Sequence, residues 1–141
     1  MIDMKACIEF ANENKLCFLA TVENDQPRVR AMEFWFADET GFYFQTGSIK
    51  ELINHIKANP KVETCFYKAG EMAGTMMRVA GKADFITDQR LKEKAMQDRP
   101  FLKEMGLTAD SPHLILFRIA HGEAYFWGLE TNLKPKEKII F

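Results

Sequence analysis

Short apolar runs alternate with polar turns along most of the chain, and this pattern predicts more strands than helices. Within the runs, apolar residues recur with a period of two or stand side by side, which is typical of strands that bury one or both faces. Clusters of Gly, Pro, Asn and Asp separate the runs, and several are short enough for hairpins. We predict six strands, over Leu16–Val22, Arg28–Ala37, Phe42–Gln45, Val62–Tyr67, Thr75–Ile86 and His113–Trp127.

Capping residues and helical spacing predict helices near both ends of the chain. The first covers Asp3–Asn14, with the aspartate as its cap. Thr87 or Asp88 opens a charged helix that runs to about Asp98, and a short helical piece follows over residues 100–106. The segment that contains these last two helices is the only long connection, so the other strands are joined mainly by hairpins.

Two features in the second half of the chain are less regular. Gly81 interrupts the strand Thr75–Ile86, which predicts a bulge or a close approach of another backbone. The tail Glu130–Lys138 is polar and we expect it to be mobile, although Ile139–Phe141 could dock against the rest of the protein.

Residues 46–60, T-G-S-I-K-E-L-I-N-H-I-K-A-N-P, predict an amphipathic helix with an unusual start. Its apolar face holds Ile49, Leu52, Ile53 and Ile56. Ser48 followed three residues later by Glu51 matches a capping box. Lys50 would then stand in the first turn, where the helix dipole disfavours a cation. A bound phosphate, shared by free backbone N–H groups, the hydroxyl and the ammonium, would explain this placement. The alternative is that Ser48 only caps the helix and Lys50 only faces solvent.

Two arginines at the start of the second predicted strand offer a further anion site. Alternation along Arg28–Ala37 places Arg28 and Arg30 on the same face, where guanidinium groups can hold a phosphate bidentately. The alternative is an exposed edge with solvated arginines. One hairpin separates this strand from the helix that carries Ser48 and Lys50, so Arg30 can converge with them on one dianion.

No other motif indicates a catalytic or metal centre. His55, His113 and His121 lack the spacing of metal ligands, and we interpret them as structural or exposed. The cysteines are odd in number and far apart, which indicates neither a disulfide framework nor a zinc site: Cys7, Cys17 and Cys65. We nominate no catalytic side chain and no metal ligand.

The strand pattern and the composition favour a mostly β domain with short helices, an antiparallel six-stranded barrel rather than a doubly wound sheet. At 141 residues, we expect residues 1–141 to form a single domain. A net charge of −1 gives no electrostatic reason to expect binding to nucleic acid or a membrane surface. No run approaches the ~18 apolar residues of a membrane span, and the N-terminus lacks a signal-peptide pattern. We therefore expect a cytoplasmic location.

The order of these segments resembles a family of flavoproteins. The stretch F-Y-F-Q-T-G-S-I-K-E-L-I-N-H-I-K-A-N-P-K-V-E-T-C-F is followed by V-A-G-K-A-D and preceded by F-L-A-T-V-E-N-D-Q-P-R-V-R-A-M. Together they are similar to the pyridoxamine 5′-phosphate oxidase-like family of FMN-binding split β-barrels, over about Leu16 to Trp127. The resemblance implies a homodimer with two FMN molecules at the subunit interface.

The resemblance also implies which residues bind FMN. Arg30, Ser48 and Lys50 would hold the phosphate. Backbone groups of two strands would line the ribityl chain and the flavin ring, at Ala31, Met32, Glu33, Phe44, Gln45 and Thr46. Trp127 would approach the flavin from the partner subunit, and Arg28 lies beside the pattern without an assigned role.

The end of the chain departs from the true pyridoxamine 5′-phosphate oxidases. Those enzymes end in an arginine-rich segment with an R-L-A-P-like signature, whereas G-L-E-T-N-L-K-P-K-E-K-I-I-F follows Trp127 here. The chain is more similar to the short members, the general stress protein 26-like proteins and the nitroimidazole-resistance reductases. We therefore expect an FMN-dependent reductase of small molecules, with hydride chemistry at flavin N5. Two alternatives stay open: a non-catalytic flavin- or haem-binding stress protein, and a deazaflavin-using reductase.

Overall fold

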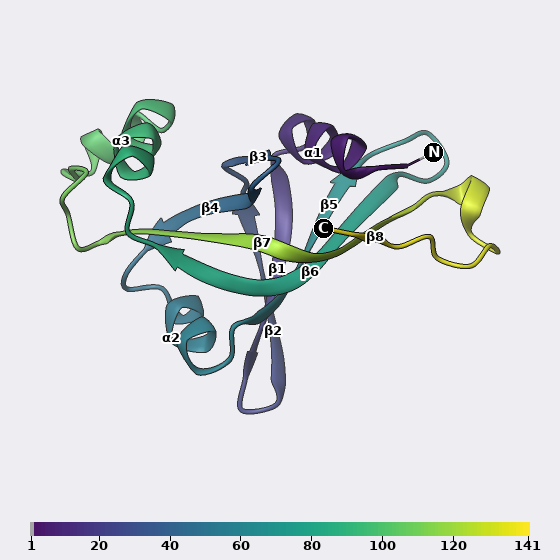
Figure 1. Cartoon of the computed structure of the whole chain (residues 1–141), viewed down its shortest axis with the longest axis horizontal. Coiled ribbons are helices and arrows are strands. Elements are labelled where there is room, and N and C mark those ends of the chain that lie inside the picture. The colour runs from purple at the N-terminus through teal and green to yellow at the C-terminus, as the bar shows by residue number, and fades with distance from the viewer. Residues whose placement is uncertain (1) are drawn as a thin grey trace.

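The alternating segments form eight antiparallel strands that hydrogen-bond into one sheet (Figure 1). The structure is a computed structural model and describes residues 2–141. The strands are β1 (Leu16–Glu23), β2 (Gln26–Glu33), β3 (Phe36–Asp38), β4 (Gly41–Gly47), β5 (Lys61–Lys68), β6 (Thr75–Ile86), β7 (Leu114–Trp127) and β8 (Ile139–Ile140). Their order in the sheet is β2-β1-β5-β6-β7-β4-β3, and β8 pairs with β7. The mostly β architecture is confirmed.

The prediction of a six-stranded barrel was wrong, because eight strands form one sheet that does not close. The single strand predicted over Arg28–Ala37 is broken between β2 and β3, which lie at opposite ends of the strand order. The break falls at Phe34 and Trp35, two consecutive residues that are both buried but in different hydrophobic clusters. The chain leaves the sheet at these two residues, and each side chain packs into its own cluster. The Phe34 N–H donates to the Lys15 carbonyl instead, at 2.6 Å.

The C-terminal residues Ile139–Phe141 dock on β7, as the sequence had suggested for this apolar end. β8 pairs with β7, and Phe141 and Gly122 exchange two backbone hydrogen bonds of 3.1 Å. The predicted bulge is also present, as a register shift between Gly81 and Ala83. A Cβ at Gly81 would lie 2.4 Å from the His121 carbonyl oxygen, so this position admits only glycine.

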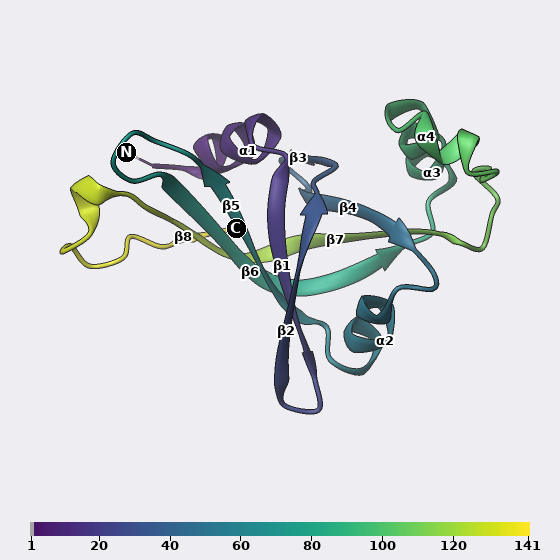
Figure 2. The same cartoon turned by 180° about the vertical axis from the view of Figure 1, so that it is seen from behind.

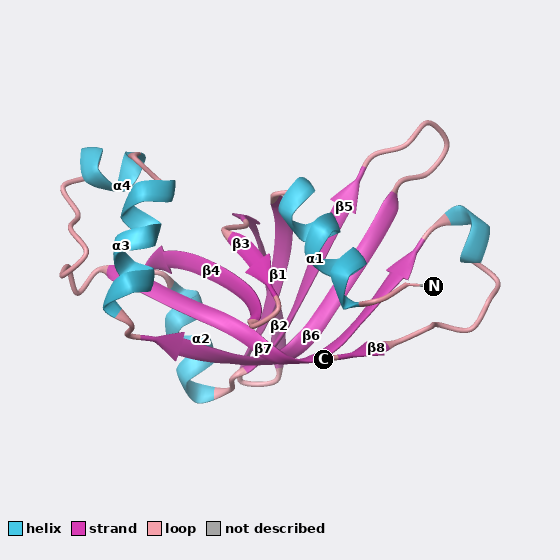
Figure 3. Cartoon of the chain, turned by 45° about the horizontal axis from the view of Figure 1, so that its top comes forward, coloured by secondary structure: helices cyan, strands magenta, loops and turns pink. Residues whose placement is uncertain are grey.

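The helices are spread around the sheet, at both of its ends and beside its middle strands (Figure 3). They are α1 (Met4–Glu13), α2 (Glu51–Ala58), α3 (Gln89–Asp98), α4 (Phe101–Glu104) and the 3₁₀ helix η1 (Leu129–Thr131). The caps Asp3 and Asp88 are confirmed, because each carboxylate accepts a backbone hydrogen bond of 3.0 Å, from Ala6 and Leu91. Figures 1 and 2 show α3 and α4 at one end of the molecule and η1 at the opposite end. None of the helices in residues 2–141 combines the length and apolar character that crossing a membrane requires.

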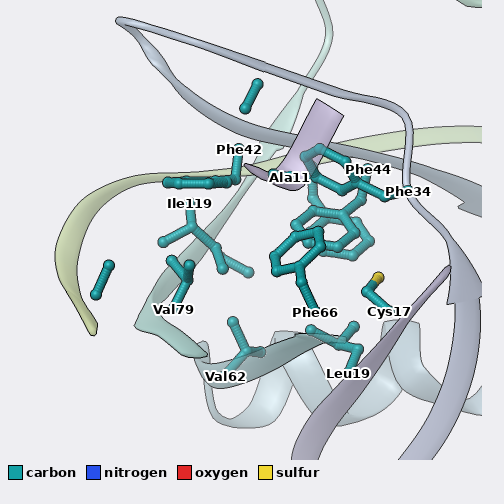
Figure 4. Packing of buried hydrophobic residues seen from close by; sticks show 14 of the residues in the cluster. Ala11, Cys17, Leu19, Phe34, Phe42, Phe44, Val62, Phe66, Val79 and Ile119 are labelled. Atoms are coloured by element: carbon teal, nitrogen blue, oxygen red, sulfur yellow. The ribbon is translucent and has the colours of Figure 1, made fainter. Parts of the chain in front are cut away.

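The main core is filled by phenylalanine rings between the strands (Figure 4). Phe34 lies edge-on to Phe66 and Phe44, with ring centroids 4.9 and 5.2 Å apart, and Phe44 stacks on Phe117 at 4.8 Å. Such pairs contribute roughly 0.5–1.5 kcal/mol each beyond the burial of their area. The contacts of Phe34 hold the chain in place directly after β2, which ends at Glu33, and so help to position the last residues of β2.

A smaller cluster attaches α3 and α4 to one end of the sheet. It contains Trp35, Tyr43, Ala95, Leu102, Leu114 and Leu116. The Trp35 Nε1–H also donates to Asp98 Oδ2 at 2.8 Å, at the end of α3. This packing holds α4 against the end of the sheet where the candidate site lies.

Candidate functional site

A cavity of about 840 Å³ opens where the ends of β2 and β4 meet the start of α2 and the α4 segment. Eight of the ten residues that the sequence predicts to bind a cofactor line it: Arg30, Ala31, Met32, Glu33, Gln45, Thr46, Ser48 and Lys50. They come from two strands that are not neighbours in the sheet and from the loop after β4. The fold therefore brings the two predicted anion-binding segments to one place.

The loop before α2 differs from its prediction. α2 begins at Glu51, Lys50 is at the N-cap position without a side-chain capping bond, and Ile49 is 87% exposed rather than on the apolar face. Ser48 does not cap the helix. Its Oγ lies 2.7 Å from Nδ1 of His113, and its N–H donates to the His113 carbonyl oxygen at 3.1 Å.

The pairing of β4 with β7 explains this outcome, because it places Ser48 beside the start of β7. The capping box predicted from Ser48 and Glu51 was therefore wrong, since a partner distant in sequence takes the hydroxyl. Lys50 is at the N-cap rather than in the first turn, and as a cation at the positive end of the helix dipole it is still disfavoured there. The N–H groups of the first turn of α2 have no acceptor within the helix, and they point out of the same helix end where Lys50 stands.

Arg30 is held by a chain of buried polar groups. Its Nη1 donates to Thr21 Oγ1 at 2.8 Å and to the Leu19 carbonyl oxygen at 3.2 Å. The Thr21 hydroxyl lies 2.8 Å from Nδ1 of His55, and these two residues are only 1% and 4% exposed. Because Thr21 accepts from Arg30, its own proton can go to His55 Nδ1, which assigns the ring proton to Nε2. That nitrogen lies 3.3 Å from Glu23 Oε2 without the alignment of a hydrogen bond.

Arg30 is a partly buried cation. Desolvation lowers the pKa of its guanidinium, and the nearby Glu51 only partly offsets this. Among residues 2–141, no carboxylate lies within ion-pair distance of Arg30 or Lys50. The polar end of the cavity therefore has two cations without an ion-pair partner in the described part of the chain, with Glu51 also in the lining, and this pair fits a bound anion such as a phosphate.

Arg28 does not join this site. Its Nε donates to Glu23 Oε1 at 3.0 Å in the β1–β2 hairpin, outside the cavity lining. Arg28 is the main reason that the pKa of Glu23 is lowered. The pair is exposed and contributes little to stability.

The remaining two predicted binding residues lie elsewhere in the chain. Phe44 is fully buried and stacks on Phe117, so its side chain faces the core and only its backbone is on the side of β4 near the site. Trp127 lines a second cavity of about 560 Å³ beside α1 and η1, and its Nε1–H donates to Asn132 Oδ1 at 2.9 Å. Within one chain, Trp127 is not part of the first cavity.

The other end of the cavity was not predicted from the sequence. It has an apolar wall from α4 and the segment after it: Phe101, Leu102, Met105 and Leu107. Arg99, between α3 and α4, also lines the cavity and is only 9% exposed. Its Nη2 donates to the Glu33 carbonyl oxygen at 2.8 Å. The only local signal in this segment was the helix break at Pro100. It does not show that Arg99 contacts the end of β2, 66 residues earlier in the chain.

Comparisons with known proteins agree on one family. Residues 4–128 match the family model described as pyridoxamine 5′-phosphate oxidase. A NimC/NimA family protein from Clostridium acetobutylicum is 28% identical, with a TM-score of 0.80 over 98% of this chain and 93% of that one. General Stress Protein 26 from Bacillus anthracis is 23% identical, with a TM-score of 0.76 over 99% and 100%. An FAD-binding protein from Mesorhizobium loti is 18% identical, with a TM-score of 0.70 over 89% and 94%. No curated protein sequence matches.

Proposed function

The chain belongs to the pyridoxamine 5′-phosphate oxidase family, and we propose that it is a flavoprotein that binds FMN and uses it to reduce small molecules. One observation carries this proposal: Arg30 from β2 lines a single cavity together with Ser48 and Lys50 from the loop after β4. A flavin-binding protein of the same fold, the FAD-binding protein from Mesorhizobium loti, is consistent with a flavin in this family.

The polar end of the cavity would hold the phosphate of FMN. Arg30 offers a planar fork of donors, while Lys50 offers a compact charge on a flexible stem. The N–H groups at the start of α2 supply neutral donors, and the Ser48 hydroxyl adds another when His113 Nδ1–H donates to its oxygen. The buried partners Thr21 and His55 restrict the guanidinium of Arg30 to one orientation, so little entropy is lost when it binds an anion.

The rest of the cavity would take the flavin ring and a flat acceptor. The backbone of β2 and β4 lines one side, and the apolar wall at Phe101 and Leu102 covers the other. When bound, the flavin supplies hydride transfer, and the protein's part is to bind, orient and exclude water. We assign no side chain as acid, base or nucleophile.

A second copy of the chain would complete the site. Side chains that face each other across antiparallel strands share one face of the sheet, and the register places Leu16, Phe18, Val29, Ala31, Tyr67 and Trp127 together. Leu16, Phe18, Val29 and Tyr67 are exposed on this outer face, which also carries Glu33, Glu63 and Arg78, and Ala31 also lines the cavity. A dimer that covers this face would bury these side chains and bring Trp127 of the partner subunit toward the flavin. An obligate interface of this kind buries on the order of 2,000 Å² or more.

The C-terminal segment supports a reductase rather than an oxidase of pyridoxamine 5′-phosphate. Two of its three lysines are engaged locally: Lys138 Nζ lies 3.0 Å from Glu123 Oε1, and Lys136 Nζ lies 4.7 Å from the ring centroid of Tyr125. The segment provides no arginine to hold a second phosphate. We expect no appreciable oxidation of pyridoxine 5′-phosphate. Turnover of this compound at an ordinary rate of about 1 s⁻¹ or faster would contradict this and indicate a pyridoxine 5′-phosphate oxidase.

The proposal is tested by spectroscopy and steady-state kinetics on the purified protein. The absorption spectrum identifies a bound flavin and separates it from haem or deazaflavin. Oxidation of NAD(P)H with a nitroaromatic acceptor would support the reductase, while flavin binding without turnover would favour the non-catalytic stress protein. Sedimentation should show a dimer, and a stable monomer with flavin bound would contradict the shared site.

A further inference from the structure

We propose that Arg99 forms a second anion subsite at the apolar end of the cavity, which binds the carboxylate of a planar aromatic substrate. This inference rests on the proposed function and adds the substrate class to it. The two cations of the polar end, Arg30 and Lys50, come from other segments, so the phosphate of FMN does not need Arg99.

The first observation is that Arg99 is buried without a carboxylate partner. It is 9% exposed, and among residues 2–141 no carboxylate lies within ion-pair distance of its guanidinium. The neighbouring Asp98 is engaged elsewhere, because its Oδ2 accepts from Lys94 Nζ at 2.6 Å and from Trp35 Nε1 at 2.8 Å. A buried charge is costly unless it is paired and hydrogen-bonded, and an anionic ligand would supply the missing partner.

The second observation is that Arg99 has donors to spare. A guanidinium carries five N–H groups, and in the described part of the chain the Arg99 side chain makes one hydrogen bond, to the Glu33 carbonyl oxygen. Its nitrogens are not among the fully buried side-chain atoms without a partner in residues 2–141. Because Arg99 lines the cavity, these free donors are open to a ligand inside it.

Arg99 is desolvated at this end of the cavity, and the carboxylates of Glu33 and Asp98 lie close enough to act on its charge. Burial lowers the pKa of Arg99, and Glu33 and Asp98 only partly offset this effect. Burial and the charge of Arg99 also lower the pKa of Lys15, whose Nζ donates to the Trp35 carbonyl oxygen at 2.6 Å. Arg99 and Lys15 are therefore neighbouring cations, and of the two only Arg99 lines the cavity where a carboxylate could bind.

The apolar wall defines the rest of the ligand. The ring of Phe101 lies 6.0 Å from the Arg99 guanidinium carbon, and Leu102, Met105 and Leu107 continue the surface. A planar aromatic body would pack against these side chains with its carboxylate directed to Arg99 in a bidentate contact. One arginine beside several apolar side chains suits a compact aromatic acid better than a phosphate ester with a long polar chain.

The experiment compares two acceptors of the same shape and different charge. The FMN-loaded protein is titrated with 4-nitrobenzoate and with nitrobenzene, and binding is followed by the change in the flavin absorption spectrum. We expect the wild type to bind 4-nitrobenzoate about tenfold or more tightly than nitrobenzene. Arg99→Met should abolish this preference, and Arg99→Lys, which keeps the charge but loses the fork, should retain part of it. Arg90→Gln, at an exposed position of α3, is the matched control and should keep the full preference.

Several outcomes would overturn the subsite. Equal affinity of the wild type for the two acceptors would do so, as would an unchanged preference in both Arg99 variants. A loss of FMN affinity in Arg99→Met with the preference intact would show that Arg99 serves the cofactor instead.

If the protein binds no flavin, the same titrations are carried out by calorimetry on the flavin-free protein. A preference for 4-nitrobenzoate that depends on Arg99 then supports the subsite even though the proposed function fails, and the absence of such a preference overturns both.

Discussion

The two ends of the cavity place their cations in different surroundings. Arg30 at the polar end has two hydrogen-bond acceptors, and a buried threonine and histidine stand behind it. Arg99 at the apolar end has one hydrogen bond and lines the cavity together with the apolar side chains of Phe101 and Leu102. The polar end is already organised, which suits a cofactor that stays bound. The apolar end leaves a buried charge to be compensated, which suits a ligand that exchanges.

Removing a cation from the polar end should have the largest effect. Lys50→Ala or Arg30→Ala removes a charge-assisted bond to the phosphate, so FMN affinity should fall by about ten- to a hundredfold. Riboflavin lacks the phosphate, and its affinity should hardly change. Arg28→Ala, which removes an exposed arginine outside the cavity, is the control. FMN affinity within twofold of wild type in both cavity variants would contradict the assignment of this end.

Loosening the support of Arg30 should have a smaller effect of the same kind. Thr21→Val keeps the shape of the side chain but removes the hydroxyl between Arg30 and His55, so FMN affinity should fall by about two- to tenfold. The ratio of FMN to riboflavin affinity measures this, because a general loss of stability would weaken both flavins.

Thr64→Val is the matched control for this variant. Thr64 is equally buried on β5, but its Oγ1 has no hydrogen-bond partner among residues 2–141. Its replacement should leave FMN affinity unchanged and should not lower the melting temperature, since no hydrogen bond is lost. If both valine variants lowered the FMN to riboflavin ratio equally, Thr21 would have no special role in positioning Arg30.

The smallest effect is expected at the apolar wall, and it should spare the cofactor. Phe101→Ala removes the ring beside Arg99, so the affinity for nitrobenzene should fall by about threefold. The ratio of FMN to riboflavin affinity should not change. Phe85→Ala, at another exposed ring outside the cavity lining, should alter neither quantity. A change of the flavin ratio in Phe101→Ala would show that the two ends are not independent.

Local patterns predicted much of the fold. The period of two predicted the strands, and the Asn24-Asp25 turn has the left-handed φ angles of 48° and 67° that such residues tolerate in tight hairpins. The caps Asp3 and Asp88 were predicted because a cap depends on residues three positions away. The break at Phe34 was not predictable in this way, since it depends on which of two clusters each ring joins.

In the candidate site, too, some residues were predicted from local patterns and others were not. Arg30 and Lys50 were predicted together because one hairpin links their segments, and both line the cavity. The partner of Ser48 was not predictable, because the competing His113 is 65 residues away and is brought near only by strand pairing. Arg99 was missed for the same reason: its burial depends on a distant strand end. Charge in a local pattern is visible in a sequence, whereas its burial by a distant element is not.

The affinity ratio of the flavin-free wild-type protein for FMN and riboflavin tests the central claim most directly. Two or more charge-assisted bonds to the phosphate predict that FMN binds about a hundredfold more tightly or better. The preference should shrink as salt screens the exposed Lys50. Equal binding of the two flavins within twofold would contradict a phosphate site built from Arg30, Ser48 and Lys50.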